Sequence, residues 1–144
     1  MLQDLRLTRC AYDWRAEHVP TFEEEILQYQ KHGIEFFAFW GVHETAFQLF
    51  EKYDLKPQIW LMLAQPEATS QAAKVDEAVR QVLPAVERTR RLGSKLSLYN
   101  HGGWSGEPDN LVAIWRQLRE AGHDHVSIVY NFHHGHEHID DWPA

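Results

Sequence analysis

The sequence predicts an α/β protein in which parallel strands alternate with helices. Short apolar runs rich in aromatic and β-branched residues alternate with longer amphipathic segments along the 144 residues. None of the apolar runs is joined to the next by a two-residue hairpin turn. Each strand and helix together span roughly 25–35 residues, the size of one βαβ unit. Short connections between alternating elements favour parallel strands with right-handed crossovers.

The first predicted strand is residues 7–12, and a helix follows it. Thr21 and Glu24 have the spacing of a capping box, so the helix is expected to begin at Thr21. Gly33 is expected to end this helix, because glycine readily adopts the left-handed conformation that terminates helices.

The second predicted strand, residues 34–40, reads IEFFAFW. Because nearly every position is apolar, we expect both of its faces to be buried. A short helix should follow it, with Phe47, Phe50 and Tyr53 at spacings of three, and should end before Pro57.

The third predicted strand is residues 58–64, and a long helix should cover residues 71–92. Pro84 lies inside that helix, where the missing N–H and the bulk of the ring should kink the helix or split it. Gly93 should end it.

The fourth and fifth predicted strands are residues 95–100 and 126–131. Between them, Pro108 is well placed as the first residue of a helix that ends at Gly122.

Composition limits the classes of partner. The formal net charge is −7 and no stripe of lysine and arginine stands out, so we expect no nucleic-acid partner. No apolar run reaches membrane-spanning length and the first residues do not resemble a signal peptide, so we expect no membrane partner and a cytoplasmic location. Cys10 is the single cysteine, which excludes an internal disulfide.

Polar and aromatic side chains collect after the carboxyl ends of the predicted strands, whereas the opposite ends are plainer. In parallel α/β folds, ligands bind at the carboxyl ends of the strands. The residues are Asp13, Trp14, Arg15, Trp40, His43, Glu44, Gln65, Asn100, His101, Trp104, Asn131, His133, His134 and His136. The sequence therefore predicts a binding site at this end of the sheet.

The stretch YNFHHGHEH, residues 130–138, has two interpretations. Neutral imidazoles together with carboxylates can hold Zn, Mn or Fe. The same histidines could equally be solvated residues of a polar loop. Histidines recur at three predicted strand ends, which favours a site.

Four segments resemble the xylose isomerase-like TIM-barrel family of sugar phosphate isomerases and epimerases (AP endonuclease family 2), which shares its fold with endonuclease IV. They read AYDWRAEHVPTF, KHGIEFFAFW, LYNHGGWSGEPDN and VSIVYNFHHGHEHID. The resemblance implies that residues 1–144 form a single incomplete domain, a partial (β/α)8 TIM barrel containing strands two to six. It also implies that this chain alone is inactive. A flavodoxin-like doubly wound sheet is the alternative fold.

The resemblance also implies a metal site, with a glutamate after the fifth barrel strand and an Asp-x-x-His pair after the sixth. In this sequence these positions are Tyr99, Asn131 and His134, so two of the three depart from the family pattern. Tyrosine and asparagine are poorer ligands than carboxylates for hard cations. His101, His134 and His136 are the substitute ligands expected for Zn, Mn, Mg or Fe.

The activity that the resemblance implies is proton transfer next to the carbonyl of a sugar or sugar phosphate. His101 and His134 are the expected acid, base or ligand residues. Expected substrate contacts are hydroxyl bonds from Asn100 and Asn131, an apolar wall of Trp14, Trp40 or Trp104, and a phosphate or carboxylate pair with Arg15. The alternatives are a non-catalytic carbohydrate-binding barrel and a metal-dependent phosphodiesterase like endonuclease IV.

Overall fold

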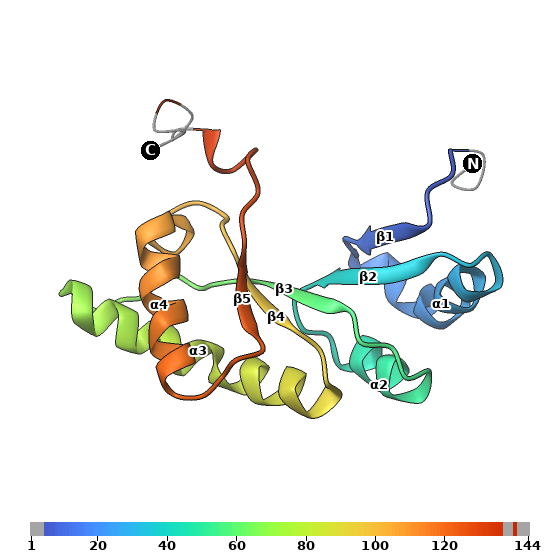
Figure 1. Ribbon diagram of the computed structural model, residues 1–144, viewed down its shortest axis with the longest axis horizontal. Helices are drawn as coiled ribbons and strands as arrows, with labels where there is room; N and C mark the ends of the chain where they lie inside the picture. Colours follow the sequence, from blue (N-terminus) through green and yellow to red (C-terminus); the bar gives the residue numbers. More distant parts are fainter. Residues whose placement is uncertain (1–4, 137–139, 141–144) are drawn as a thin grey trace.

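Five parallel strands form one sheet in the order in which they occur along the chain (Figure 1). The computed structural model describes residues 5–136 and residue 140. The strands are β1 (Arg9–Tyr12), β2 (Glu35–Trp40), β3 (Gln58–Met62), β4 (Leu96–Tyr99) and β5 (Val126–Val129). The helices are α1 (Phe22–Lys31), α2 (Glu44–Lys52), α3 (Gln71–Leu92) and α4 (Pro108–Glu120), with short 3-10 helices η1 (Ala16–Thr21) and η2 (Trp104–Gly106). The predicted alternation of parallel strands and helices is confirmed.

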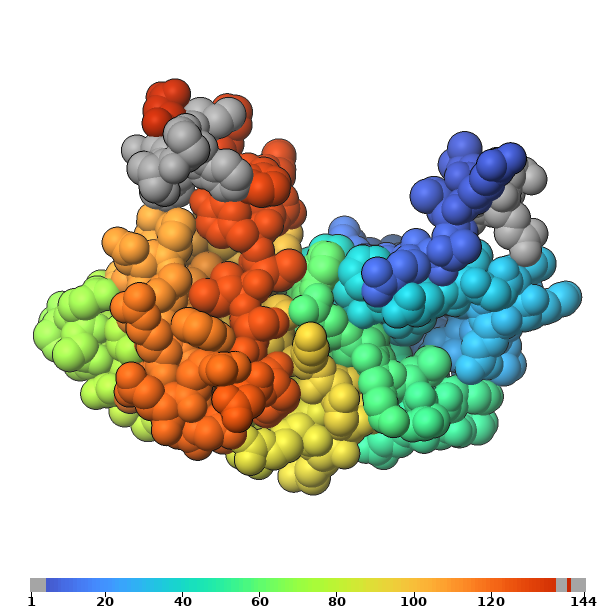
Figure 2. Space-filling model, viewed as in Figure 1, coloured from blue at the N-terminus to red at the C-terminus, as the bar shows by residue number. Residues whose placement is uncertain are grey.

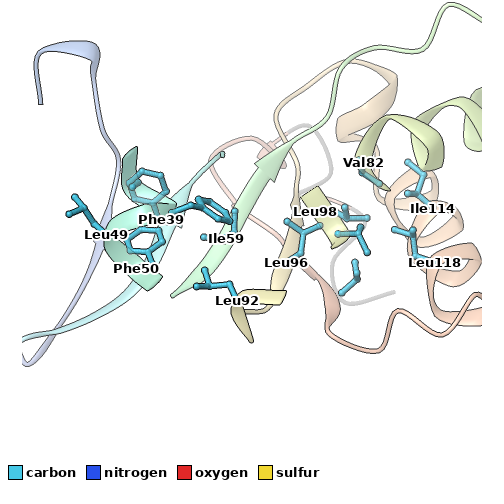
Figure 3. Close-up of a cluster of buried hydrophobic side chains, with 14 of the residues drawn as sticks. Phe39, Leu49, Phe50, Ile59, Val82, Leu92, Leu96, Leu98, Ile114 and Leu118 are labelled. Atoms are coloured by element: carbon cyan, nitrogen blue, oxygen red, sulfur yellow. The ribbon is translucent and has the colours of Figure 1, made fainter. Parts of the chain in front are cut away.

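All four α-helices pack on the same face of the sheet. Phe39, Ile59, Leu96 and Val126 are register partners across four strands, so they share one face. These four residues belong to a single buried cluster that also contains residues of α1, α2, α3 and α4 (Figure 3). A flavodoxin-like sheet has strand order 2-1-3-4-5 and helices on both faces, so that alternative is wrong for this chain.

The opposite face of the sheet is aromatic. Trp40, Trp60 and Ser97 are register partners one position beyond the buried row, and Met62 pairs with Tyr99 further along. We call Phe37, Trp40, Trp60, Met62 and Tyr99 the aromatic face. Phe37 and Trp40 are only half-buried, and Met62 is 50% exposed. The expectation that both faces of residues 34–40 are buried is therefore wrong, because no helix described by the structure covers this face.

A bulge in β2 changes which of its side chains point to each face of the sheet. The register between β1 and β2 shifts by one residue after Cys10. Phe36 and Phe39, three positions apart, consequently both contact Phe50 on α2, whereas Phe37 contacts Trp60 on the other face. The bulge thus supplies an extra aromatic ring to the aromatic face.

One local prediction is wrong, and a second is narrowed. The capping box between Thr21 and Glu24 is absent: the Thr21 hydroxyl instead bonds the His18 carbonyl oxygen at 2.9 Å and the Glu25 carboxylate at 2.8 Å. Of the kink or split expected at Pro84, the split does not occur, because α3 continues over 22 residues. Val82 and Val86 are buried on either side of the proline, and this packing offsets the lost backbone hydrogen bond. Pro108 begins α4 as predicted.

The segments that enter β1 and leave β5 project to the same side of the molecule. Figure 2 shows the surface hollowed between them. Exposed apolar side chains lie on both segments, Leu5 and Leu7 before β1 and Phe132 after β5. Among the helices of the described residues, none combines the length and apolar character needed to cross a membrane.

Candidate functional site

Two histidine rings meet at the carboxyl end of the sheet. His101 follows β4 and His134 follows β5, and their ring centroids lie 4.4 Å apart. Because Tyr99 pairs with Val129 in register, the segments that leave these two strands run next to each other. His101 is exposed and His134 is half-buried. The structure thus brings together the two histidines that the sequence singled out, and we call them the histidine pair.

Tyr99 joins the histidine pair to the aromatic face. Its ring centroid lies 6.2 Å from that of His101 and 5.7 Å from that of His134. On its other side, Tyr99 stacks on Trp60 with an interplanar angle of 11°, and Trp40 meets Trp60 edge-on at 4.4 Å. These rings form a continuous apolar wall beside two imidazoles, the combination typical of small-molecule sites.

Trp40 was predicted to belong to this wall, whereas Trp60 and Tyr99 join it only in the structure. The alternation along β3 held the signal: Ile59 is buried, so Trp60 must point to the opposite face. The same alternation places Tyr99 opposite Leu98 on β4.

The two candidate asparagines have structural roles. Asn100 is 1% exposed, and its side chain bonds both backbone polar groups of Asn131. Its Oδ1 accepts the Asn131 backbone N–H at 2.6 Å, and its Nδ2 donates to the Asn131 carbonyl oxygen at 3.1 Å. Because Asn100 is buried and bonded in this way, the expectation that it bonds a sugar hydroxyl is not supported. Asn100 extends the pairing of β4 with β5 beyond their last ladder residues.

Asn131 orients the groups next to the histidine pair. Its side-chain Oδ1 accepts the backbone N–H of His133 at 2.9 Å. Its Nδ2 donates to the Tyr99 hydroxyl oxygen at 2.6 Å. Asn131 therefore holds both the loop that carries His134 and the phenol beneath the pair.

The other residues that were predicted to contact the substrate bond to groups of the protein itself. Trp14 donates its indole N–H to the Trp40 carbonyl oxygen at 2.7 Å, and its ring stacks on Phe39 in the helix-facing core. Arg15 pairs with Asp13 at 2.6 Å. Trp104 donates to the side chain of Gln71 on α3 at 2.9 Å. The indole groups of Trp14 and Trp104 therefore have partners within the chain. The Arg15 side chain is exposed, so its pairing with a phosphate or carboxylate stays a prediction.

Residues that follow β3 hold the loop between β4 and α4 in place. Gly103 has φ 62° and ψ −172°, a conformation almost exclusive to glycine, and an added Cβ would meet the Gln65 side chain. The Ser105 hydroxyl donates to the Ala64 carbonyl oxygen at 2.8 Å. The glycine therefore allows Gln65 to pack on the loop that carries His101.

The described residues do not provide a complete metal site. Within residues 5–136 and 140, no group of three or more histidine, cysteine or acidic side chains converges. His136 is exposed and no contact described by the structure joins it to the histidine pair, and His138 lies outside the described residues. Two imidazoles fall short of the three protein ligands usual at catalytic zinc. The expected set of His101, His134 and His136 stays a prediction.

The environment of His134 favours its neutral form. Burial is the main cause that lowers the pKa of His134 from its ordinary value, followed by the positive charge that His101 and His133 carry when protonated. A neutral imidazole can accept a proton near pH 7. The same shift makes the folded state less stable as the pH falls below 6.5, because the unfolded chain then binds the proton more readily.

We predict that His134 titrates below 6.5 and that His101→Gln moves its pKa upward, because the substitution removes one neighbouring cationic group. Imidazole NMR signals followed against pH would measure both values. His32→Gln, at the end of α1, is the control and should leave the titration of His134 unchanged. Unchanged titration in His101→Gln would mean that the two rings do not interact.

A cavity of about 610 Å³ lies at the opposite end of the strands, where its lining includes Arg9, Glu35, Lys56 and Lys95. Its cations are mostly paired with acids: Arg9 bonds Glu35 and Lys56 bonds Asp54. The histidine pair does not line this cavity. The candidate site therefore depends on the chemistry of its side chains and on its place at the carboxyl ends of the strands.

Comparisons of the chain with models of known protein families, with curated proteins and with solved structures found no match.

Proposed function

We propose that the histidine pair and the aromatic face form the sugar-binding, proton-transferring site of an isomerase or epimerase. The observation that carries the proposal is the 4.4 Å separation of the His101 and His134 rings beside the wall of Trp40, Trp60 and Tyr99. Aromatic faces suit the apolar C–H surface of a sugar, and imidazoles suit proton transfer at neutral pH.

In the proposed reaction, neutral His134 accepts a proton from the carbon next to the sugar carbonyl. The electron pair of the broken C–H bond forms the carbon–carbon double bond of an enediolate, and the carbonyl oxygen becomes negative. His101 donates a hydrogen bond to that oxygen. The proton of the neighbouring hydroxyl passes to the former carbonyl oxygen, where His101 is bonded, and the proton held by His134 returns to the former carbonyl carbon. The neighbouring carbon then carries the new carbonyl, which completes an isomerisation. Because the two rings lie in contact on one side, this one-base reaction is favoured over an epimerisation that uses bases on both sides.

We further propose that the sheet is part of a (β/α)8 barrel. Sequential parallel strands with all helices outside are the arrangement of such a barrel, in which inward side chains fill the interior in layers. Trp40, Trp60, Ser97 and Ser127 would be inward side chains of such a barrel, divided between neighbouring layers because each layer draws on alternate strands. The active sites of these barrels lie at the carboxyl ends of the strands, where the histidine pair is found.

The test uses exchange of the proton next to the carbonyl for deuterium, followed by NMR of aldoses, ketoses and their phosphates in D2O. This exchange requires only the first step and its reversal with a deuteron from solvent. Both steps use only His101 and His134, so they can proceed in this chain although the resemblance implies no complete turnover by it alone. We expect the parent chain to catalyse exchange and His134→Gln to lower the rate about 100-fold or more. His32→Gln should exchange like the parent. Equal rates for His134→Gln and the parent, or no exchange with any sugar, would refute the proposed reaction.

A non-catalytic carbohydrate-binding role is the second candidate. It is favoured by the aromatic wall together with the absence of an acidic residue at positions 99 and 131, where the resembled family has its ligands. Sugar binding that shifts the His101 and His134 signals without any proton exchange would support this role over catalysis.

A further inference from the structure

We infer that the buried Tyr99 hydroxyl donates a hydrogen bond to an oxygen of the ligand bound at the histidine pair. This inference rests on the proposed function for the identity of that oxygen, a sugar carbonyl or hydroxyl. It assigns to Tyr99 a role that the wall of aromatic rings alone does not require.

The direction of the hydrogen bond between Asn131 and Tyr99 is fixed by a third group. Asn131 Oδ1 accepts the backbone N–H of His133 at 2.9 Å, so Oδ1 and Nδ2 cannot be exchanged without losing that bond. Nδ2 must then donate to the Tyr99 oxygen, at 2.6 Å. The phenol is held as an acceptor, and its own proton is left to donate.

That proton has no acceptor among the residues that the structure describes, although Tyr99 is only 4% exposed. Buried donors nearly always have a partner. Tyr99 is the last residue of β4, and its ring lies beside both His101 and His134. A ligand oxygen bound at the histidine pair would be the missing acceptor.

A fixed donor of this kind acts on the charge that develops in the reaction. As the C–H bond breaks, the carbonyl oxygen becomes an oxyanion, and a hydrogen bond from a poorly solvated phenol strengthens. The Asn131 amide holds the phenol oxygen in place during this change. Tyr99 would therefore contribute more to the rate of exchange than to ligand affinity.

Tyr99→Phe removes only the hydroxyl and keeps the ring that stacks on Trp60. We expect it to fold, to bind sugar about threefold to tenfold more weakly, and to lower the exchange rate on the order of 100-fold. Tyr53→Phe is the matched control, because its hydroxyl bonds Glu23 between α1 and α2, away from the histidine pair. It should behave like the parent.

Asn131→Asp tests the same inference from the other side. A carboxylate cannot donate a hydrogen bond, so the Tyr99 hydroxyl would donate its proton to the new Asp side chain. It could then no longer donate to the ligand. With chelator present, we expect Asn131→Asp to match Tyr99→Phe, and the double variant to be no worse than either single variant.

The outcomes separate the two proposals. Parent-like exchange and binding in Tyr99→Phe would overturn the role of Tyr99 while leaving the proposed reaction in place. If the parent binds sugar without exchange and Tyr99→Phe weakens that binding, the donor role stands and the reaction fails. Absence of sugar binding by the parent would overturn both.

Discussion

Phe39→Ala is expected to destabilise the fold by about 3–5 kcal/mol, a large share of the roughly 5–15 kcal/mol that stabilises a typical domain. Phe39 is 1% exposed and contacts Phe50 on α2 (Figure 3). It also contacts Phe22 on α1 and Trp14. The cavity left by its ring would lie where two helices meet the sheet, and β2 is too constrained to close it. Chemical denaturation followed by tryptophan fluorescence would measure the loss.

Phe37→Ala is the matched control, with the same substitution two residues away on the same strand. Phe37 is half-buried on the aromatic face, where it contacts Trp60 and the Arg9 guanidinium. We expect the loss of its ring to lower stability by about 1 kcal/mol, since the half-buried Phe37 buries less apolar surface than Phe39 does. Equal costs for the two variants would contradict the one-sided arrangement of helices, and would mean that the aromatic face is covered in solution.

Much of the fold follows from local patterns in the sequence. The alternation of apolar runs with amphipathic segments predicted all five strands, and glycines and prolines predicted most helix ends. Pro108 at the start of α4 and Gly93 after α3 are examples, each set by backbone constraints that act within a few residues. Strand direction followed from the length of the connections.

The faces of the sheet and the partners of polar side chains were harder to predict, because they depend on contacts across strands. The apolar composition of residues 34–40 suits burial on both faces, yet the helices all pack on one. Asn100 looked like a ligand group from sequence, and only the register of β4 against β5 shows that its amide bonds the backbone of Asn131. Trp14 follows a strand end, but its indole N–H is directed to the Trp40 carbonyl oxygen.

The contrast between His134 and Trp14 shows what the strand-end rule can predict. Both residues follow the carboxyl end of a strand. His134 lies on the side of the aromatic face, next to Tyr99, whereas Trp14 packs into the helix-facing core. The rule predicts which residues come near the carboxyl rim, and the side of the sheet decides which of them can meet a ligand.

Asn100→Leu is expected to separate the two segments that carry the histidine pair. Leucine has a similar size but no polar atoms, so the backbone N–H of Asn131 would lose its partner, whereas its C=O would keep the backbone N–H groups of His134 and Gly135. A buried N–H left unpaired costs about 1–3 kcal/mol. The segment after β5 would consequently detach from the segment after β4, and His134 would move away from His101.

Two measurements on Asn100→Leu test this expectation. The free energy of unfolding should fall by about 1–3 kcal/mol, and the pKa of His134 should rise toward 6.5, because both its burial and its contact with His101 decrease. Ser97→Ala is the control, since Ser97 is equally buried and bonds Ser127 across the same strand pair at 2.7 Å, two residues before Tyr99 on β4. It should lower stability slightly and leave the titration of His134 unchanged. If Asn100→Leu lowers stability and His134 still titrates as in the parent, the geometry of the pair does not depend on the Asn100 bridge, and the loop after β5 must be held by its own contacts.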